Sequence, residues 1–187
     1  MIIREAKIED AAAIAKVHVN SWRTTYQGIV PDHYLAGLSY ERSELMWRDI
    51  LSNSQPINFT VVAEDNQGNV IGFANGGRER EGNPTYTGEV FAIYILEEFQ
   101  RKGIGSQLMV ALVSRLIQAG LNSLLVWVLE ENPARRFYET LGGKLVSQKS
   151  LNIGGANLTI VSYGWKDAHE IIENALGFLS SPKENLQ

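Results

Sequence analysis

The feature that most constrains this chain is a turn, Gln-Arg-Lys-Gly-Ile-Gly-Ser at residues 100–106. The run before it, residues 89–95, is typical of a strand, and the run after it, residues 104–116, is typical of a helix. Glycines at 103 and 105 let the backbone approach a ligand closely, and the first turn of a helix presents free N–H groups at the positive end of its dipole. The turn therefore predicts a cradle for an anion, and a phosphate-bearing cofactor is the first ligand to expect.

Taken alone, this turn is not specific, because Gly-x-Gly also occurs in tight strand-to-helix turns that bind nothing. It lacks the closing Gly-Lys-Ser/Thr of a phosphate-binding Walker loop. It also lacks the third glycine of the dinucleotide fingerprint, which belongs near the start of a Rossmann unit. Nucleotide hydrolysis and hydride transfer are therefore disfavoured, while a turn without a ligand stays open.

Composition narrows the class of protein. A chain of 187 residues with 44% hydrophobic and 20% charged side chains matches a globular protein with one main domain. Its apolar runs, such as residues 124–129, are too short to cross a bilayer, and the first residues lack a secretory pattern, so we expect a cytoplasmic protein with no membrane partner. The absence of cysteine excludes disulfides, thiolate zinc sites and a thioester intermediate on the protein. A net charge of −4 disfavours nucleic acid as a partner.

Periodicity and turn residues predict a mixed α/β fold in the order β-α-α-β-β-β-α-β-α-β-β, with helices against the sheet. Strands are expected at residues 2–6, 59–63, 70–75, 89–95, 123–129, 144–151 and 158–165, and helices at residues 8–22, 40–51, 104–116 and 133–141. Residues 1–166 are expected to form the single domain. Residues 167–187 are expected to add a C-terminal helix and a frayed tail from Ser180, and this helix either packs on its own sheet or bridges a homodimer.

A second motif lies about thirty residues after the turn, where Asn132 precedes a short helical segment with Tyr138 and then Leu141-Gly142. The two motifs, in this order and spacing, resemble the GNAT superfamily of acetyl-CoA-dependent N-acetyltransferases. The stretch from Trp22 to Pro31 also resembles one bacterial subgroup of small acetyltransferases. The resemblance implies an acyl-CoA N-acyltransferase fold, with a mostly antiparallel sheet and splayed central strands. It implies acetyl-CoA as co-substrate.

The resemblance also implies roles for particular residues. Main-chain groups of Ile93, Tyr94 and Ile95 would pair with the pantetheine arm like an added strand. Asn132 would bind the pantetheine amide, although it stands six residues before the tyrosine, where the family commonly has seven. Arg135 and Arg136 either meet the adenosine phosphate or remain solvated. The pyrophosphate would be held by Arg101, Lys102, Gly103, Ile104, Gly105 and Ser106.

Two side chains are the candidate catalytic groups. Tyr138 is the expected general acid, because a phenol with an ordinary pKa of ~10 stays protonated near neutrality and can supply a proton to the departing thiolate. The alternative is that Tyr138 is a packing aromatic on the inner face of the helix, whose hydroxyl makes only a structural hydrogen bond. Glu89 is the expected base toward the attacking amine through water, and strand alternation places it on the face of Phe91 and Ile93. A solvated strand end is the alternative for this carboxylate.

The expected reaction is direct attack of a primary amine on acetyl-CoA in a ternary complex, with the oxyanion held by a backbone N–H near Tyr94 or Ile95. The acceptor is a small molecule or a protein amine, and net acidity mildly favours a cationic small molecule. Trp22, Tyr26, Tyr34 and Trp47 either wall the acceptor pocket or pack helix against sheet. The rivals are a non-catalytic acyl-CoA-binding sensor, a transferase of a longer acyl group and a non-enzymatic interaction module. The three histidines are not spaced in the sequence like metal ligands, so we expect no metal site.

Overall fold

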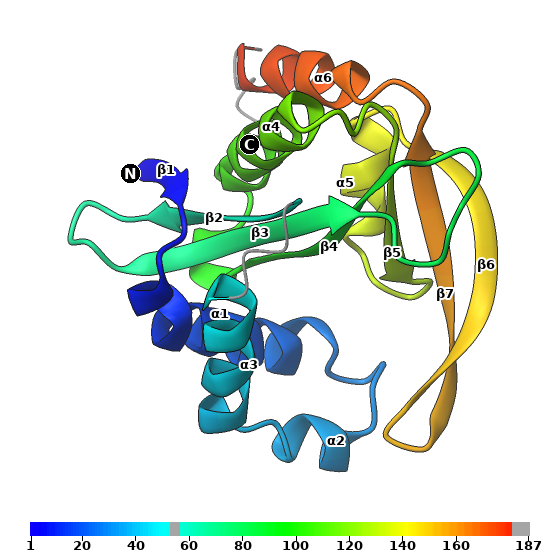
Figure 1. The fold of residues 1–187 in the computed structure, drawn as a ribbon. Helices are drawn as coiled ribbons and strands as arrows, with labels where there is room; N and C mark the ends of the chain where they lie inside the picture. Colours follow the sequence, from blue (N-terminus) through cyan, green and yellow to red (C-terminus); the bar gives the residue numbers. More distant parts are fainter. Residues whose placement is uncertain (53–56, 181–187) are drawn as a thin grey trace, which may run out of the picture.

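The fold is a single mixed sheet between two layers of helices, in a computed structural model that describes residues 1–52 and 57–180 (Figure 1). The strand order is β1-β2-β3-β4-β5-β7-β6. The strands are β1 (Ile2–Glu5), β2 (Asn58–Glu64), β3 (Val70–Arg78), β4 (Gly88–Ile95), β5 (Leu124–Leu129), β6 (Lys144–Ile153) and β7 (Ala156–Trp165). Every neighbouring pair is antiparallel except β4 and β5, which are parallel. The predicted mixed α/β class is confirmed.

The helices divide between the two faces of the sheet. One face carries α4 (Ile104–Gln118), α5 (Arg135–Thr140) and α6 (His169–Ser180), and the other carries α1 (Ala11–Thr25), α2 (Asp32–Ala36) and α3 (Tyr40–Ser52) (Figure 1). Two 3-10 turns, Ile8–Asp10 and Glu97–Phe99, complete the chain. No helix of the described residues has the length and apolarity that a membrane span requires.

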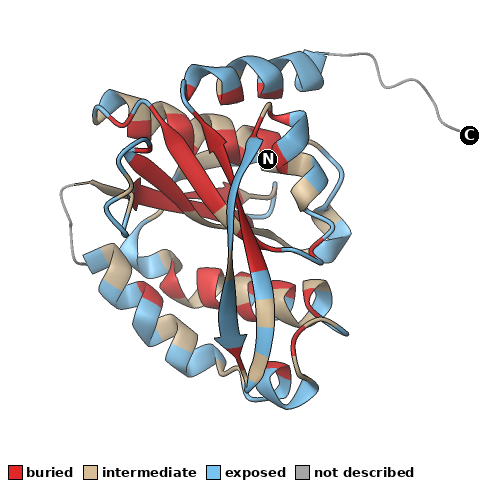
Figure 2. Cartoon of the chain, turned by 90° about the vertical axis from the view of Figure 1, so that its right-hand side faces the viewer, coloured by how far each residue is buried: buried red, intermediate tan, exposed pale blue. Residues whose placement is uncertain are grey.

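Burial explains why these elements assemble in this way. On α4, Leu108, Leu112 and Leu116 recur every four residues and are fully buried against the sheet, as an amphipathic helix requires. The apolar strand β5 is buried along most of its length, which confirms a central position. Figure 2 shows the buried residues gathered on the sheet and on the helix faces turned toward it.

The parallel strands β4 and β5 diverge soon after they begin. They pair only between residues 88–90 and residues 124–126, so no strand of the described residues pairs with the rest of β4 on that side. A bulge lies on the other side of β4, because Asn75 pairs with Ala92 while Gly76 pairs with Val90, which leaves Phe91 extra. This divergence is the splayed sheet that the family resemblance implies.

The bulge also corrects one expectation. Simple alternation would place Glu89 and Ile93 on the same face, but Val90 and Ile93 both pack in the core that contains α4. Ala92 instead packs in the core that contains α1 and α3. An extra residue in a strand shifts the alternation by one, so the predicted shared face of Glu89 and Ile93 is wrong.

Most element predictions are confirmed to within a few residues. The first helix begins as a 3-10 turn and runs on to Thr25, and the short helix before Gly142 begins at Arg135 rather than at residue 133. Helix α2 was not predicted, because five residues are too short for a periodic signal. The C-terminal helix is present and packs on its own chain, with Ile171 and Ala175 in the core beside α4. Ser180, the expected first residue of the frayed tail, is instead the last residue of α6, and the rest of that tail, residues 181–187, lies outside the described residues.

Candidate active site

The glycine turn forms a row of free backbone donors where α4 begins. None of the N–H groups of residues 101–106 donates to another group in the described chain, and the first backbone bond of the helix runs from Gln107 N to Gly103 O. Arg101 (φ 59°) and Gly103 (φ 80°) both have left-handed backbone conformations. Successive free amides in such a turn form a concavity that suits an anion, and the helix dipole adds to the attraction. The predicted anion cradle is therefore present as a geometry, and a diphosphate fits its donors.

The side chains around the cradle differ in availability. The Arg101 guanidinium has no hydrogen bond or ion pair within the described residues, so it is free for a ligand. The Lys102 ammonium donates to Glu98 O at 2.8 Å and lies over the Phe99 ring, which turns it back from the cradle. A Cβ added at Gly103 would lie 2.9 Å from Leu179 Cδ2, so the last turn of α6 reaches the cradle.

The open edge of β4 leads directly into this cradle. Leu96 N donates to Ile71 O on β3, and backbone groups of an antiparallel strand alternate between its two edges. The backbone groups of Tyr94 therefore also face β3, whereas those of Ile93 and Ile95 face the open side. Of the three residues expected to pair with a pantetheine arm, Ile93 and Ile95 offer main-chain groups there. Ile95 O already accepts from Gln100 Nε2 at 3.0 Å.

A chain of polar contacts crosses the opening between β4 and β5. The hydroxyls of Tyr26 and Tyr94 are 3.3 Å apart, and Asn132 Nδ2 donates to Tyr26 Oη at 3.4 Å. Asn132 Oδ1 accepts from Ala134 N at 2.9 Å, which shapes the turn before α5. Burial raises the pKa of the Tyr26 phenol and raises that of Tyr94 well above its ordinary value. The expected contact of Asn132 with pantetheine stays a prediction, and this network of phenols was missed by sequence reasoning.

Tyr138 lies beside these phenols on the inner face of α5. Its side chain is 5% exposed, and its hydroxyl makes no hydrogen bond within the described residues. Burial, and secondarily the charge of a nearby ionised Tyr26, raises its pKa far above the ordinary value for a phenol. A protonated donor with an unused hydroxyl is what the general-acid prediction requires.

Glu89 is buried and paired. It is 2% exposed, and both of its oxygens accept from the guanidinium of Arg80. The guanidinium also lies over the Phe91 ring, 4.3 Å from its centroid. The alternative of a solvated strand end is excluded by this burial, while the role as base stays a prediction. Arg80 comes from a polar loop and had no sequence signal of its own.

Comparison with known proteins agrees with this geometry. Residues 20–142 match the family described as acetyltransferase (GNAT) family. The chain belongs to the GNAT family. It is therefore an acetyl-CoA-dependent acyltransferase by class.

Relatives of this GNAT chain extend over nearly its whole length. It is 43% identical over 165 residues to the uncharacterized N-acetyltransferase YuaI of Bacillus subtilis (strain 168), covering 88% of this chain and 92% of the relative. An N-acetyltransferase of Staphylococcus aureus Mu50 has a TM-score of 0.70 at 24% identity, covering 89% and 98% of the two chains. The PaiA N-acetyltransferase of Thermoplasma acidophilum, in complex with coenzyme A, has a TM-score of 0.67 at 20% identity, covering 88% and 98%. These two structures show a shared fold.

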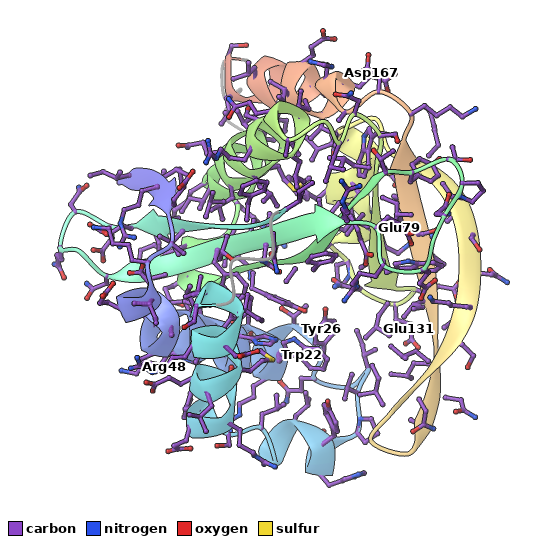
Figure 3. All side chains as sticks on the ribbon, viewed as in Figure 1. Trp22, Tyr26, Arg48, Glu79, Glu131 and Asp167 are labelled. Carbon is purple, nitrogen blue, oxygen red and sulfur yellow. The ribbon has the colours of Figure 1, made fainter. Side chains whose placement is uncertain are left out.

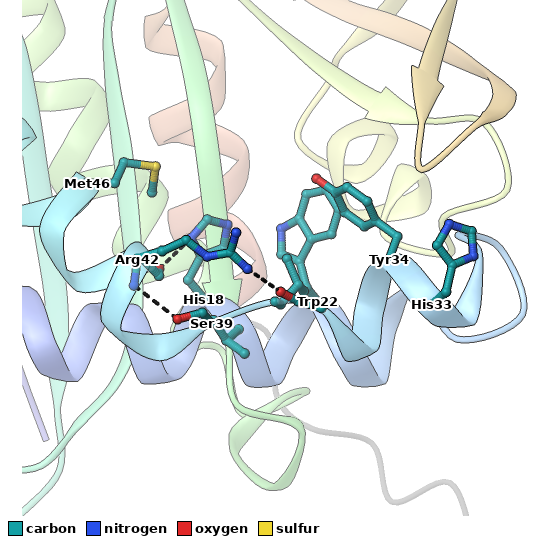
Figure 4. A pocket seen from close by; sticks show the side chains of 11 residues that line it. His18, Trp22, His33, Tyr34, Ser39, Arg42 and Met46 are labelled. Carbon is teal, nitrogen blue, oxygen red and sulfur yellow. Dashed lines mark hydrogen bonds between the residues drawn. The ribbon is translucent and has the colours of Figure 1, made fainter.

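The GNAT domain has a cavity of about 530 Å³ between α1, α2 and α3, which we call the helical pocket (Figure 4). Of the aromatics expected to wall an acceptor pocket, Trp22 and Tyr34 line it. Trp47 instead packs in the core beside Phe73, and Tyr26 contacts the Trp22 ring edge-on with centroids 4.7 Å apart. Figure 3 shows Trp22 and Tyr26 close together between the sheet and α2.

The helical arginines of α5 are not equivalent in this GNAT chain. Arg135 donates to Tyr163 Oη at 3.1 Å and to Glu130 O at 2.9 Å, so its guanidinium is held within the protein. Arg136 makes no side-chain hydrogen bond or ion pair in the described part of the chain. Only Arg136 therefore has the freedom that contact with an adenosine phosphate would require. Within the described ranges, no three histidine or carboxylate side chains gather as a metal site.

Proposed function

We propose that this enzyme moves an acetyl group from acetyl-CoA to a primary amine by direct attack in a ternary complex. The observation that carries the proposal is the row of free amides at residues 101–106, which continues from the unpaired edge of β4. The amides and Arg101 suit the diphosphate of coenzyme A. The outward backbone groups of Ile93 and Ile95 suit an extended pantetheine chain that runs along β4.

The same edge supplies the groups for the chemistry. The amine nitrogen forms a bond to the thioester carbonyl carbon, and the resulting oxyanion would accept from the Ile95 N–H, which faces the open side. The oxyanion then re-forms the carbonyl as the C–S bond breaks, and Tyr138 would give its proton to the leaving sulfur. Its hydroxyl is free for this role and its pKa is raised by burial. The second proton of the attacking nitrogen is lost as the amide forms and, passed through solvent, restores the phenol.

The amine must also lose a proton, because a free alkylamine with a pKa of ~10 is mostly protonated at neutral pH. We assign this step to Glu89, acting through water. A carboxylate bound by one guanidinium retains lone pairs that can accept from a water molecule. This role requires that Arg80 orients the carboxylate and leaves those lone pairs accessible.

The direct test measures binding first and turnover second. Calorimetry is expected to show that acetyl-CoA binds, and a panel of amines is expected to give stoichiometric coenzyme A release with no acetylated protein. If acetyl-CoA does not bind, a non-enzymatic interaction module is the remaining function. If acetyl-CoA binds but no amine is acetylated, the remaining function is that of an acyl-CoA-binding sensor. Competition between acyl chain lengths would identify a transferase of longer acyl groups, and a chase-competent acetyl-enzyme would contradict direct attack.

A further inference from the structure

The helical pocket is lined mainly by apolar and aromatic side chains, and Arg42 supplies a charged group. Trp22, Tyr34, Leu38 and Met46 supply much of this surface. Among the described residues that line it, Arg42 is the only Lys or Arg, and none is Asp or Glu. A cationic occupant, such as a polyamine, would find an arginine and no carboxylate there. The pocket therefore opposes the weak preference for cations that net charge suggests.

Arg42 lies at the mouth of the pocket, and its guanidinium has N–H donors that are not used within the described residues. Its Nη2 donates to Gly37 O at 2.8 Å, and its guanidinium forms no ion pair in the described chain (Figure 4). The neighbouring carboxylate of Glu41 does not line the pocket and accepts from Ser39 Oγ at 2.7 Å. A guanidinium has five N–H donors in a planar fork, which matches a carboxylate.

The inner wall adds a second donor. Trp47 Nε1 lies 3.2 Å from His18 Nδ1, and an indole nitrogen can only donate, so Nδ1 is the acceptor and the imidazole proton sits on Nε2. Burial lowers the pKa of His18 to about 4, which keeps this ring neutral at physiological pH. The Nε2–H makes no hydrogen bond within the described residues. His18 and Arg42, which both line the pocket, therefore each have an N–H that is not used within the described residues.

The pocket shares a wall with the proposed transfer centre. The His18 ring stacks on Tyr94 with centroids 5.3 Å apart and an interplanar angle of 24°. The Trp22 ring meets Tyr26, whose hydroxyl bonds to Tyr94 and Asn132. Trp22 Nε1 is a buried donor that comes near the Tyr94 phenol without the geometry of a hydrogen bond. His18 and Trp22, which line the pocket, therefore also contact the tyrosines beside the open edge of β4.

We propose that the acceptor is an amine-bearing carboxylic acid with an apolar or aromatic side chain, of which the non-reacting part occupies the helical pocket and the carboxylate binds Arg42. This inference rests on the proposed amine acetylation and names its substrate class. Apolar area contributes most of the binding free energy, and the carboxylate–guanidinium pair provides selectivity.

The experiment compares acceptors that differ only in the carboxylate. Phenylalanine, its amide and phenethylamine are assayed by coenzyme A release, with spermidine as the cationic comparison. We expect kcat/KM to be about ten- to a hundredfold higher for the acid, the range for hydrogen bonds to a charged group. Arg42→Met should remove that preference mainly through KM, and Arg42→Lys should retain part of it. A preference for spermidine or phenethylamine would overturn the inference.

Arg48→Met is the matched control. Arg48 is on the same helix, pairs with Glu44 and does not line the pocket. The Arg48→Met variant should keep both the preference for the acid and the affinity for acetyl-CoA. The Arg42→Met variant should keep only the affinity for acetyl-CoA. If no amine is acetylated, the proposed function fails, while tryptophan fluorescence titration with phenylalanine and phenethylamine still tests the pocket. The inference would be overturned if the wild-type protein bound phenylalanine and phenethylamine with equal affinity. It would also be overturned if Arg42→Met left the affinity for phenylalanine unchanged.

Discussion

Arg80 binds the carboxylate of Glu89 through two parallel hydrogen bonds, Nη2 to Oε1 at 2.5 Å and Nε to Oε2 at 3.1 Å. Glu89 lies inside the protein at the start of β4, whereas the Arg80 side chain is 62% exposed. A buried carboxylate is costly without a partner, so this contact explains how a charge is tolerated beside the core. It also orients the group that we assign as base.

Arg80→Ala should lower the free energy of unfolding by about 1–3 kcal/mol, because it leaves a buried acceptor without its donor. Glu89→Gln should cost less stability, since a neutral amide needs no counter-ion, but should lower kcat/KM by about a hundredfold or more if Glu89 is the base. Urea denaturation and coenzyme A release measure the two effects. Glu81→Gln, on an exposed side chain of the same loop, is the control. Full turnover of Glu89→Gln would contradict the assignment.

Tyr138→Phe should lower kcat by about a hundredfold or more, because it removes the proton donor while it retains the buried ring. The affinity for acetyl-CoA, measured by calorimetry, should stay within about twofold of wild type, since little packing is lost. Tyr163→Phe is the matched control, because its ring lies 6.2 Å from that of Tyr138 and its hydroxyl instead bonds to Glu139. Equal turnover of the two variants would remove Tyr138 from the mechanism.

Gly103→Ala should weaken acetyl-CoA binding by about tenfold or more, because the new methyl group meets Leu179 and displaces the amides of the cradle. A left-handed alanine also costs about 1–2 kcal/mol of stability. Gly68, in the β2–β3 turn, has φ 87° and open space around it. Gly68→Ala is therefore the control, because it should cause the same backbone strain without a steric contact. Leu179→Ala should partly restore binding to the first variant. Equal acetyl-CoA affinity of the two glycine variants would contradict this account.

His18 should make the protein less stable as the pH falls below 6.5. Its pKa is lowered by burial from 6.5 to about 4, so between these values the unfolded chain binds a proton that the folded chain does not. The free energy of unfolding therefore keeps the full contribution of His18 above pH 6.5 and loses up to about 3 kcal/mol by pH 4.

Urea denaturation of wild type and His18→Asn at pH 7 and pH 4.5 isolates this contribution from that of the carboxylates. The variant should be less stable at pH 7 through lost packing, yet should lose less stability on acidification. His33→Asn, at an exposed histidine of α2, should keep the wild-type pH dependence. The same loss in wild type and His18→Asn would refute the assignment.

Local patterns were sufficient for the fold class and for the two motifs. The glycine turn and the segment after Asn132 are continuous in sequence, and their backbone geometry depends on glycine, proline and periodicity within a few residues. The helix α4 and the buried strand β5 were predicted for the same reason, since each carries its own pattern of apolar residues. The five-residue α2 was missed because it has no full period.

The sequence by itself determined the order of elements, the family and the position of the cradle, because each depends on residue types that lie close together along the chain. Only the tertiary structure decided which distant side chains meet. The pairing of Arg80 with Glu89, the contact of Leu179 with Gly103 and the donors of the helical pocket all join separate elements. One bulged residue in β4 moved Ile93 to the face opposite to the expected one, since a shift in strand alternation arises from pairing with β3 rather than from composition.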